Sequence, residues 1–148
     1  MRKSFRYLVN FGLLFSTFAL ASNTDIDLTG KVRYYAAGTQ TGVQVDVVNK
    51  GHHPAFGPNV EVRIKDRNGN LITEQFGLKL YQYSGGTATT PNTVNSNQQG
   101  YIALRLPAGV SLFNGENLQV RVRGEGQANF GTDQRKAIAC RKGTPGCL

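Results

Sequence analysis

The sequence contains no tryptophan, only two histidines and two cysteines, and a single methionine, which is residue 1. A hydrophobic core must therefore be built from aliphatic side chains together with phenylalanine and tyrosine. Acidic residues are also scarce, with nine against 17 lysines and arginines. The carboxylates are scattered singly along the chain, so the sequence offers no obvious acid and base pair for catalysis.

The same shortages remove most groups that catalysis or metal binding would need. His52 and His53 are the only imidazoles, and adjacent histidines in a Gly- and Pro-rich loop seldom chelate one ion. They are also the only side chains that would ordinarily exchange protons near neutral pH. No Gly-x-Ser-x-Gly nucleophile motif is present. We therefore expect a protein that is not an enzyme, with no catalytic residues, no metal site and no cofactor.

Long apolar runs are absent apart from residues 7–20, which follow a basic opening and end in Ala19-Leu20-Ala21. This order is typical of a secretory signal peptide, with cleavage after Ala21. The alternative is an uncleaved anchor, but a membrane span needs about 20 apolar residues. We predict a secreted or periplasmic protein without stable membrane insertion after cleavage.

Both cysteines, Cys140 and Cys147, lie in the exported part, where an oxidising compartment favours a disulfide. Two cysteines alone lack the further ligands of a tetrahedral zinc site. Removing residues 1–21 takes three of the 17 basic residues and none of the nine acidic ones, so a basic chain with a net charge of +5 remains. Its length falls in the usual range of about 100–150 residues for one domain.

The clearest structural pattern is the stretch from Val60 to Leu71. Apolar and charged residues alternate over residues 60–65, as in a strand with one buried and one wet face. Asn68-Gly69 then predicts a tight turn into a second strand. Similar alternation predicts strands around residues 43–47, 78–83, 101–106 and 118–123, whereas residues 22–30 and 31–36 alternate weakly and suggest a short edge strand.

Residues 49–58 and 84–100 are rich in Gly, Pro and small polar residues, and we expect loops there, with one weak strand near residues 93–95. No segment has a helical period. The sequence therefore predicts an all-β, Ig-like antiparallel β-sandwich of about seven strands. We expect a signal peptide over residues 1–21, a sandwich domain over residues 22–132 and a basic tail with the disulfide over residues 133–148.

Two stretches carry a resemblance to a known family. Residues 60–72 contain an apolar strand that ends in Asp66-Arg-Asn-Gly-Asn70, and residues 93–106 contain a polar stretch that ends in Gly100 before a strand. Together, over about residues 44–124, they resemble bacterial Ig-like domains of the invasin and intimin type. The resemblance implies an Ig-like fold and a mechanical or binding role. Members of that family usually occur as tandem repeats, whereas one copy stands here.

Basic residues recur on the predicted outward faces of the strands. We expect Arg63, Lys65 and Arg105 to share one face, with Arg121 and Arg123 joining it if the last strand lies in the same sheet. Such a face would attract an anionic glycan or lipopolysaccharide through a salt-dependent field. The alternative is that these cations keep the protein soluble and protect the sheet edges from aggregation. No nucleic acid partner is expected.

A second candidate surface combines Lys79, Tyr81 and Tyr83 on one face of a strand. Tyrosine rings beside a cation could stack on sugar rings. The alternative is a partly covered face without a ligand. These residues, with the disulfide Cys140 and Cys147, complete the candidate sites.

Three functions follow as hypotheses. The first is an exported, non-enzymatic Ig-like binding module at the bacterial envelope or cell surface, which acts in adhesion or contacts a protein or a glycan. The second is a structural subunit of a surface appendage or secretion assembly, joined by strand addition through residues 22–36. The third is a binder of anionic glycan or lipopolysaccharide.

Overall fold

A computed structural model describes residues 24–84, 87–141 and 147, so the expected signal peptide lies outside the described residues. These residues form eleven strands and one 3-10 turn, η1 (Gly57–Asn59). The strands are β1 (Ile26–Ala37), β2 (Gln40–Asn49), β3 (Ala55–Phe56), β4 (Glu61–Lys65), β5 (Leu71–Gln75), β6 (Lys79–Ser84), β7 (Thr87–Pro91), β8 (Thr93–Val94), β9 (Gln99–Arg105), β10 (Asn117–Arg123) and β11 (Gln134–Ala139).

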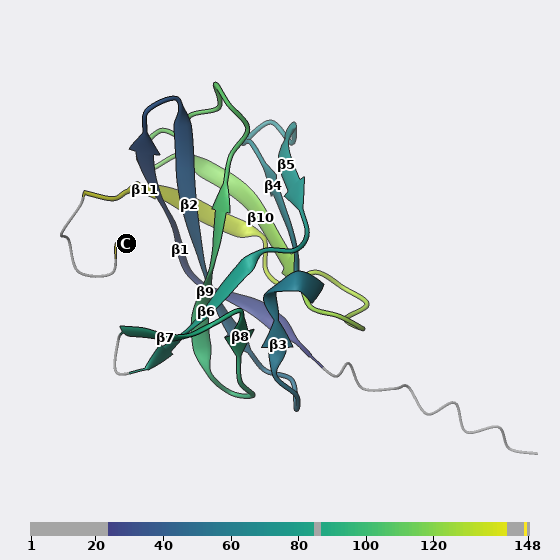
Figure 1. Cartoon of the computed structure of the whole chain (residues 1–148). Coiled ribbons are helices and arrows are strands. Elements are labelled where there is room, and N and C mark those ends of the chain that lie inside the picture. Colours follow the sequence, from purple (N-terminus) through teal and green to yellow (C-terminus); the bar gives the residue numbers. More distant parts are fainter. Residues whose placement is uncertain (1–23, 85–86, 142–146, 148) are drawn as a thin grey trace, which may run out of the picture.

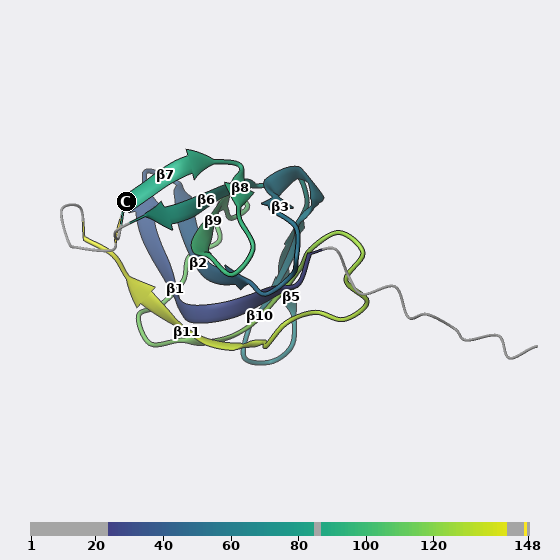
Figure 2. The ribbon, with the colours of Figure 1, turned by 90° about the horizontal axis from the view of Figure 1, so that it is seen from below.

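Nine of the strands form one sheet in the order β5-β4-β10-β11-β1-β2-β9-β6-β7, and β3 pairs with β8 (Figure 1). The large sheet curls, so that its strands surround a common interior when the molecule is seen from below (Figure 2). The all-β, Ig-like sandwich prediction is confirmed. The two layers are halves of one curled sheet, and β11 joins them, because its residues 134–136 pair with β10 and its residues 137–139 pair with β1.

The core fills the space between the halves, because strands of each half turn their apolar faces inward. Val62 and Ile64 of β4 belong to the same buried cluster as Val45 of β2 and Ile102 of β9. All four side chains are at most 1% exposed. The inward faces that the alternation predicted for these strands are confirmed.

The predicted hairpin is confirmed as well. Gly69 has a φ of +84°, and the Asp66 carboxylate accepts hydrogen bonds from the backbone N–H groups of Asn68 and Asn70. The strand at residues 93–95 is present as β8, but residues 84–100 also contain β7, and residues 49–58 contain β3. Short pairings inside these polar stretches explain why the chain has more strands than predicted.

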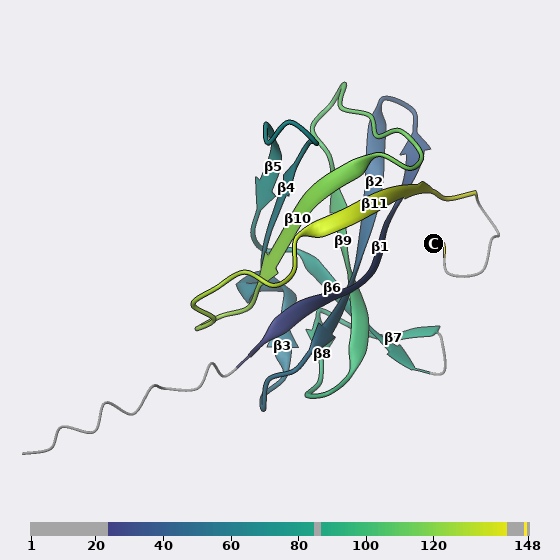
Figure 3. The same cartoon turned by 180° about the vertical axis from the view of Figure 1, so that it is seen from behind.

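Two predictions about the ends of the domain were wrong. The expected edge strand, residues 22–36, is central where it is described, because β1 pairs with β2 on one side and with β11 on the other. The segment after residue 132, expected to be a tail, contributes β11 to the sheet between β10 and β1 (Figure 3). The β1–β11 pair is also parallel, so the sheet is not fully antiparallel.

Candidate functional site

The predicted cationic face is partly assembled on β4 and β10. These strands are antiparallel neighbours, and their register places Arg121 opposite Arg63 and Arg123 opposite Glu61. Arg63, Arg121 and Arg123 therefore lie together on one outer face, as the hypothesis required.

Carboxylates already neutralise this group. Glu61 accepts from Arg123 at 2.5 Å and lies 3.5 Å from Arg63, while Glu74 of β5 accepts from Arg63 at 2.5 Å. A further pair joins Arg121 to Asp133 at 3.3 Å. The hydrogen bond and charge of Arg63 lower the pKa of Glu74, so this carboxylate is held in its charged form.

An aromatic ring covers the three arginines. The guanidinium carbons of Arg63 and Arg123 lie 4.9 Å and 4.7 Å from the centre of the Phe130 ring, and that of Arg121 lies at 6.0 Å. These are cation–π distances. Phe130 belongs to the loop between β10 and β11, which folds back along β10, since Gly131 N–H donates to the Val122 carbonyl. The face is thus a closed intramolecular cluster.

Arg105 does not belong to this face. It lies on β9, and the strands β10, β11, β1 and β2 separate β9 from β4 in the sheet. The expectation that Arg63, Lys65 and Arg105 share one face is therefore wrong for Arg105. Lys65 stays on β4 opposite Gln119. The alternation of residues predicts on which side of a strand a side chain lies, but it does not predict which strands are neighbours in the sheet.

Arg105 instead faces the second candidate surface, on the outer side of β2, β9 and β6. The register places Lys79 opposite Ala103, which in turn lies opposite Gln44, and it places Tyr81 opposite Tyr101. Arg105 continues this row of outward residues on β9. A groove of about 650 Å³, which we call the aromatic groove, is lined by residues that include Tyr35, Phe76, Lys79, Tyr81, Tyr101, Ala103 and Arg105.

Small residues lie at the base of the aromatic groove. Ala103 is half-buried on β9, and Gly42 of β2 lies opposite Arg105. A Cβ atom at Gly42 would lie only 2.3 Å from Cζ of Tyr35, so the Tyr35 ring lies directly over that glycine. Along the groove the register places Tyr81, Lys79 and Arg105 in successive rows, and Tyr35 lies in the same row as Arg105, across Gly42.

At one end of the groove, the ring of Tyr101 packs against the ring of Tyr81 and supports it. The rings of Tyr81 and Tyr101 stack with centroids 4.9 Å apart and planes 20° apart, and Tyr83 packs against Tyr101 at 5.2 Å. Tyr101 is 2% exposed, so it supports Tyr81 and leaves that ring to line the groove.

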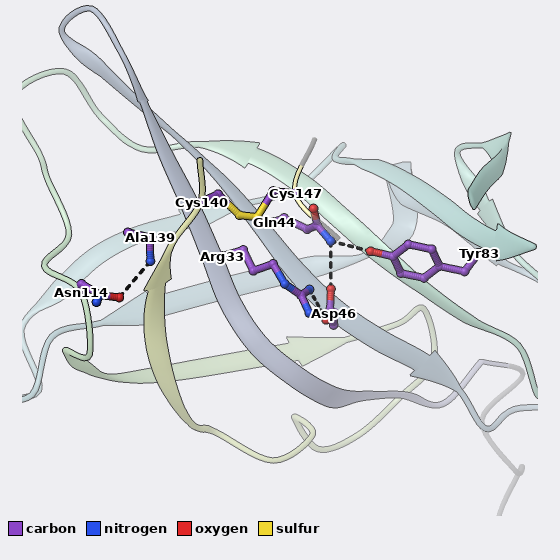
Figure 4. Close-up of a disulfide and its surroundings, with 8 residues drawn as sticks. All are labelled: Arg33, Gln44, Asp46, Tyr83, Asn114, Ala139, Cys140 and Cys147. Atoms are coloured by element: carbon purple, nitrogen blue, oxygen red, sulfur yellow. Dashed lines mark hydrogen bonds and ion pairs between the residues drawn. A yellow bond between two sulfur atoms is a disulfide. The ribbon is translucent and has the colours of Figure 1, made fainter. Parts of the chain in front are cut away.

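A polar network fixes Tyr83 in turn. Gln44 Nε2 donates to the Tyr83 hydroxyl at 2.5 Å and to Asp46 at 3.1 Å, and Asp46 also pairs with Arg33 (Figure 4). Burial and the negative charge of Asp46 raise the pKa of Tyr83 to about 12. Gln44 is itself buried, so its amide is held in place beneath the surface.

The two cations of the aromatic groove differ from Arg63, Arg121 and Arg123 of the other face in one respect. Five basic residues of the described chain form ion pairs, namely Arg33, Lys50, Arg63, Arg121 and Arg123. Lys79 and Arg105 form no ion pair with any described residue, although Arg105 donates to the Gln40 side chain at 3.2 Å. Their charges therefore remain available to an anion from outside.

The predicted disulfide is confirmed, with Cys140 and Cys147 bonded and their Cα atoms 5.6 Å apart. His52 and His53 are exposed in the loop after β2. Within residues 24–84, 87–141 and 147, no group of three or more His, Cys, Asp or Glu side chains is arranged to hold a metal ion. The same residues include no helix long and apolar enough to cross a membrane.

Three residues of the groove were not identified from the sequence, namely Tyr35, Phe76 and Tyr101. Tyr101 has the same parity on its strand as Arg105, so alternation already assigned it to the outer face. Its partner Tyr81 could not be known without the β6–β9 register. Phe76 is 66% exposed in the connection between β5 and β6, where no strand pattern places it.

Comparisons with known proteins give little further guidance. No protein-family model matches the sequence, and no curated protein matches it. Among solved structures, the chain resembles the CARDB domain of a Pyrococcus furiosus protein, with 13% identity and a TM-score of 0.35, over 80% of this chain and 96% of that one. We draw no argument from so distant a likeness, and the invasin and intimin type stays a prediction.

Proposed function

We propose that this protein is an exported, non-enzymatic Ig-like binding module of the bacterial envelope or cell surface, and that it contacts its partner through the aromatic groove. One observation carries the proposal. Lys79 and Arg105, which pair with no described carboxylate, line a groove of about 650 Å³ together with the rings of Tyr35 and Tyr81. Binding sites commonly combine aromatic walls with a few polar groups.

Export is supported by two independent features. The basic and apolar start of the chain has the order of a signal peptide, and the Cys140–Cys147 disulfide suits an oxidising compartment. The absence of enzymatic activity remains part of the proposal, because the groove offers aromatic rings and cations as contact groups. It contains no carboxylate or imidazole among its lining residues.

The two other hypotheses have less support. Strand addition through residues 22–36 lacks a free edge where those residues are described, because β1 is flanked by β2 and β11. An anionic ligand on the Arg63 face would have to displace Glu61, Glu74 and the Phe130 ring.

Cosedimentation with a bacterial envelope fraction tests the proposal. We expect the wild-type protein to sediment with envelopes and the double variant Lys79→Ala/Arg105→Ala to remain in the supernatant. The matched control is Arg67→Ala/Lys136→Ala, which removes the same charge from two exposed residues outside the groove. The proposal fails if both double variants sediment like the wild type. It also fails if neither the wild type nor the control binds envelopes.

A further inference from the structure

We propose that the aromatic groove binds an acidic saccharide chain whose sugar rings carry carboxylates. This inference rests on the proposed function and specifies the ligand of the same site. It depends on the order of groups along the groove, which runs from the Tyr81 ring to Lys79 and then to Arg105, with the Tyr35 ring beside Arg105 across Gly42.

The first step is the position of the groove on the face of the sheet. Residues 99–105 of β9 pair with β2, residues 100–103 also pair with β6, and the Arg105 carbonyl accepts a hydrogen bond from Gln75 Nε2. A peptide that binds by adding a strand needs a free sheet edge. Recognition in the aromatic groove must therefore come from side chains, which suits a ligand without an extended peptide backbone.

The second step is the shape of the rings. One face of Tyr81 stacks on Tyr101, which supports it, and the end of the Tyr35 ring lies over Gly42. Tyr35 is 41% exposed, so its outer face can be reached. Sugar rings present C–H groups that pack against such a tyrosine face while the hydroxyl groups stay in water.

The third step is the spacing of the charges. Lys79 lies opposite Ala103, and Arg105 lies two residues further along β9. Strand geometry places their Cα atoms about 8 Å apart. A ligand lying along β9 would set one ring on Tyr81 and offer successive negative charges to Lys79 and Arg105. A planar guanidinium also suits a carboxylate, which it can bind through two parallel hydrogen bonds.

Single-stranded nucleic acid also alternates rings and charges, but it favours a continuous basic track along its backbone. The outer face around the groove does not offer one. Arg33, the next cation on this side, is paired with Asp46, and that carboxylate lies opposite Tyr101. The two unpaired cations fit a short acidic saccharide better.

Calorimetric titration with a hexamer of galacturonic acid tests the inference, with a neutral galactose hexamer as the matched ligand. We expect the acidic hexamer to bind at least about tenfold more tightly than the neutral one. Lys79→Ala/Arg105→Ala should remove this preference, and Arg67→Ala/Lys136→Ala should keep it. Added salt should weaken binding of the wild type more than that of the groove variant.

A second variant tests the contribution of the Tyr35 ring to binding. Gly42→Ala forces the Tyr35 ring to move without removing any group, because the new Cβ meets only the tip of that flexible side chain. We expect it to weaken binding of the acidic hexamer severalfold while the melting transition stays cooperative.

The possible results separate the inference from the proposed function. Equal binding of both hexamers, or binding of neither, overturns the inference, whereas groove-dependent sedimentation with envelopes would still support a binding module. Tighter binding of a thymidine hexanucleotide than of the acidic saccharide also overturns it. So does unchanged affinity of Lys79→Ala/Arg105→Ala for the galacturonate hexamer.

Discussion

Arg123 and Glu61 are cross-strand partners on β10 and β4, and Nε of Arg123 lies 2.5 Å from Oε2 of a Glu61 side chain that is only 4% exposed. Glu61 is also the shared neighbour of Arg63. This buried carboxylate compensates two arginines on a face that alternation alone describes as wet.

Replacing Glu61 by Gln should lower the free energy of unfolding by about 2 kcal/mol. Removing one partner of a buried pair can cost about 3–5 kcal/mol, and partial exposure of both arginines reduces that here. Urea denaturation at neutral pH measures the change. The matched control is Glu74→Gln, where a carboxylate that is 33% exposed pairs with one arginine. Its loss should stay below about 1 kcal/mol. Equal effects of the two substitutions would contradict the central role of Glu61.

The ring of Phe130 gives a second prediction. Phe130→Leu keeps most of the apolar area but removes the aromatic face that contacts Arg63 and Arg123. We expect a loss of about 1 kcal/mol in unfolding free energy and faster amide exchange at Gly131, whose N–H donates to Val122. Phe113→Leu is the control, because Phe113 is 73% exposed and the cation–π contacts of the described residues all involve Phe130. If both variants lose the same stability, the cation–π contacts do not hold this loop.

The faces of the strands could be predicted from the sequence, because side chains in a strand alternate with period two. Val62 and Val120 are buried as expected, while Arg63 and Arg121 point outward. An outward position is nevertheless not always wet. Glu61 is buried and bound by Arg123, which lies 62 residues later in the chain, and no local pattern encodes such a contact.

The order of the strands could not be predicted. Arg105 has the expected face but lies near Lys79 and Tyr81 instead of Arg63, since sheet order depends on long-range pairing. The strand β11 was missed for a related reason. Only Ala137 of that strand is fully buried, so its sequence shows little alternation. The candidate site was consequently split between two predicted surfaces, and on one of them Arg63, Arg121 and Arg123 are held in ion pairs.

Gly100 gives a third prediction. A Cβ atom there would lie 2.1 Å from the Tyr81 carbonyl oxygen and 2.5 Å from a methyl group of Val94. The oxygen belongs to the neighbouring strand and cannot rotate away, so Gly100→Ala must separate β6 from β9. We expect a loss of at least about 2 kcal/mol in unfolding free energy, in the range of overpacked cores.

Gly42→Ala provides the contrast within the same sheet. Its Cβ meets the end of the Tyr35 side chain, which can swing outward. Its loss in unfolding free energy should therefore remain below about 1 kcal/mol. Thermal and urea denaturation of both variants would test this. Similar losses would mean that close backbone approach is not what requires glycine at residue 100.

Asp27 gives a prediction about pH. Burial of this carboxylate opposes its charged form, but hydrogen bonds from Lys50 and from the backbone N–H groups of Thr132 and Leu28 outweigh it and lower the pKa to about 2. The bond to Lys50 is 2.6 Å long. Because the folded pKa is below the unfolded value of 3.8, this group stabilises the fold above about pH 4. That contribution is lost as the pH falls through about 2.

The difference in unfolding free energy between the wild type and Asp27→Asn should therefore be about 2 kcal/mol at pH 7 and should shrink steadily below pH 4. Urea denaturation from pH 2 to pH 7 measures it. Asn keeps the size of the side chain and can still accept a hydrogen bond, so the lost term is the charge-assisted part of the interaction with Lys50 and Thr132. A difference that stays constant over this range would show that the Asp27 charge does not tie β1 to the loop before β11.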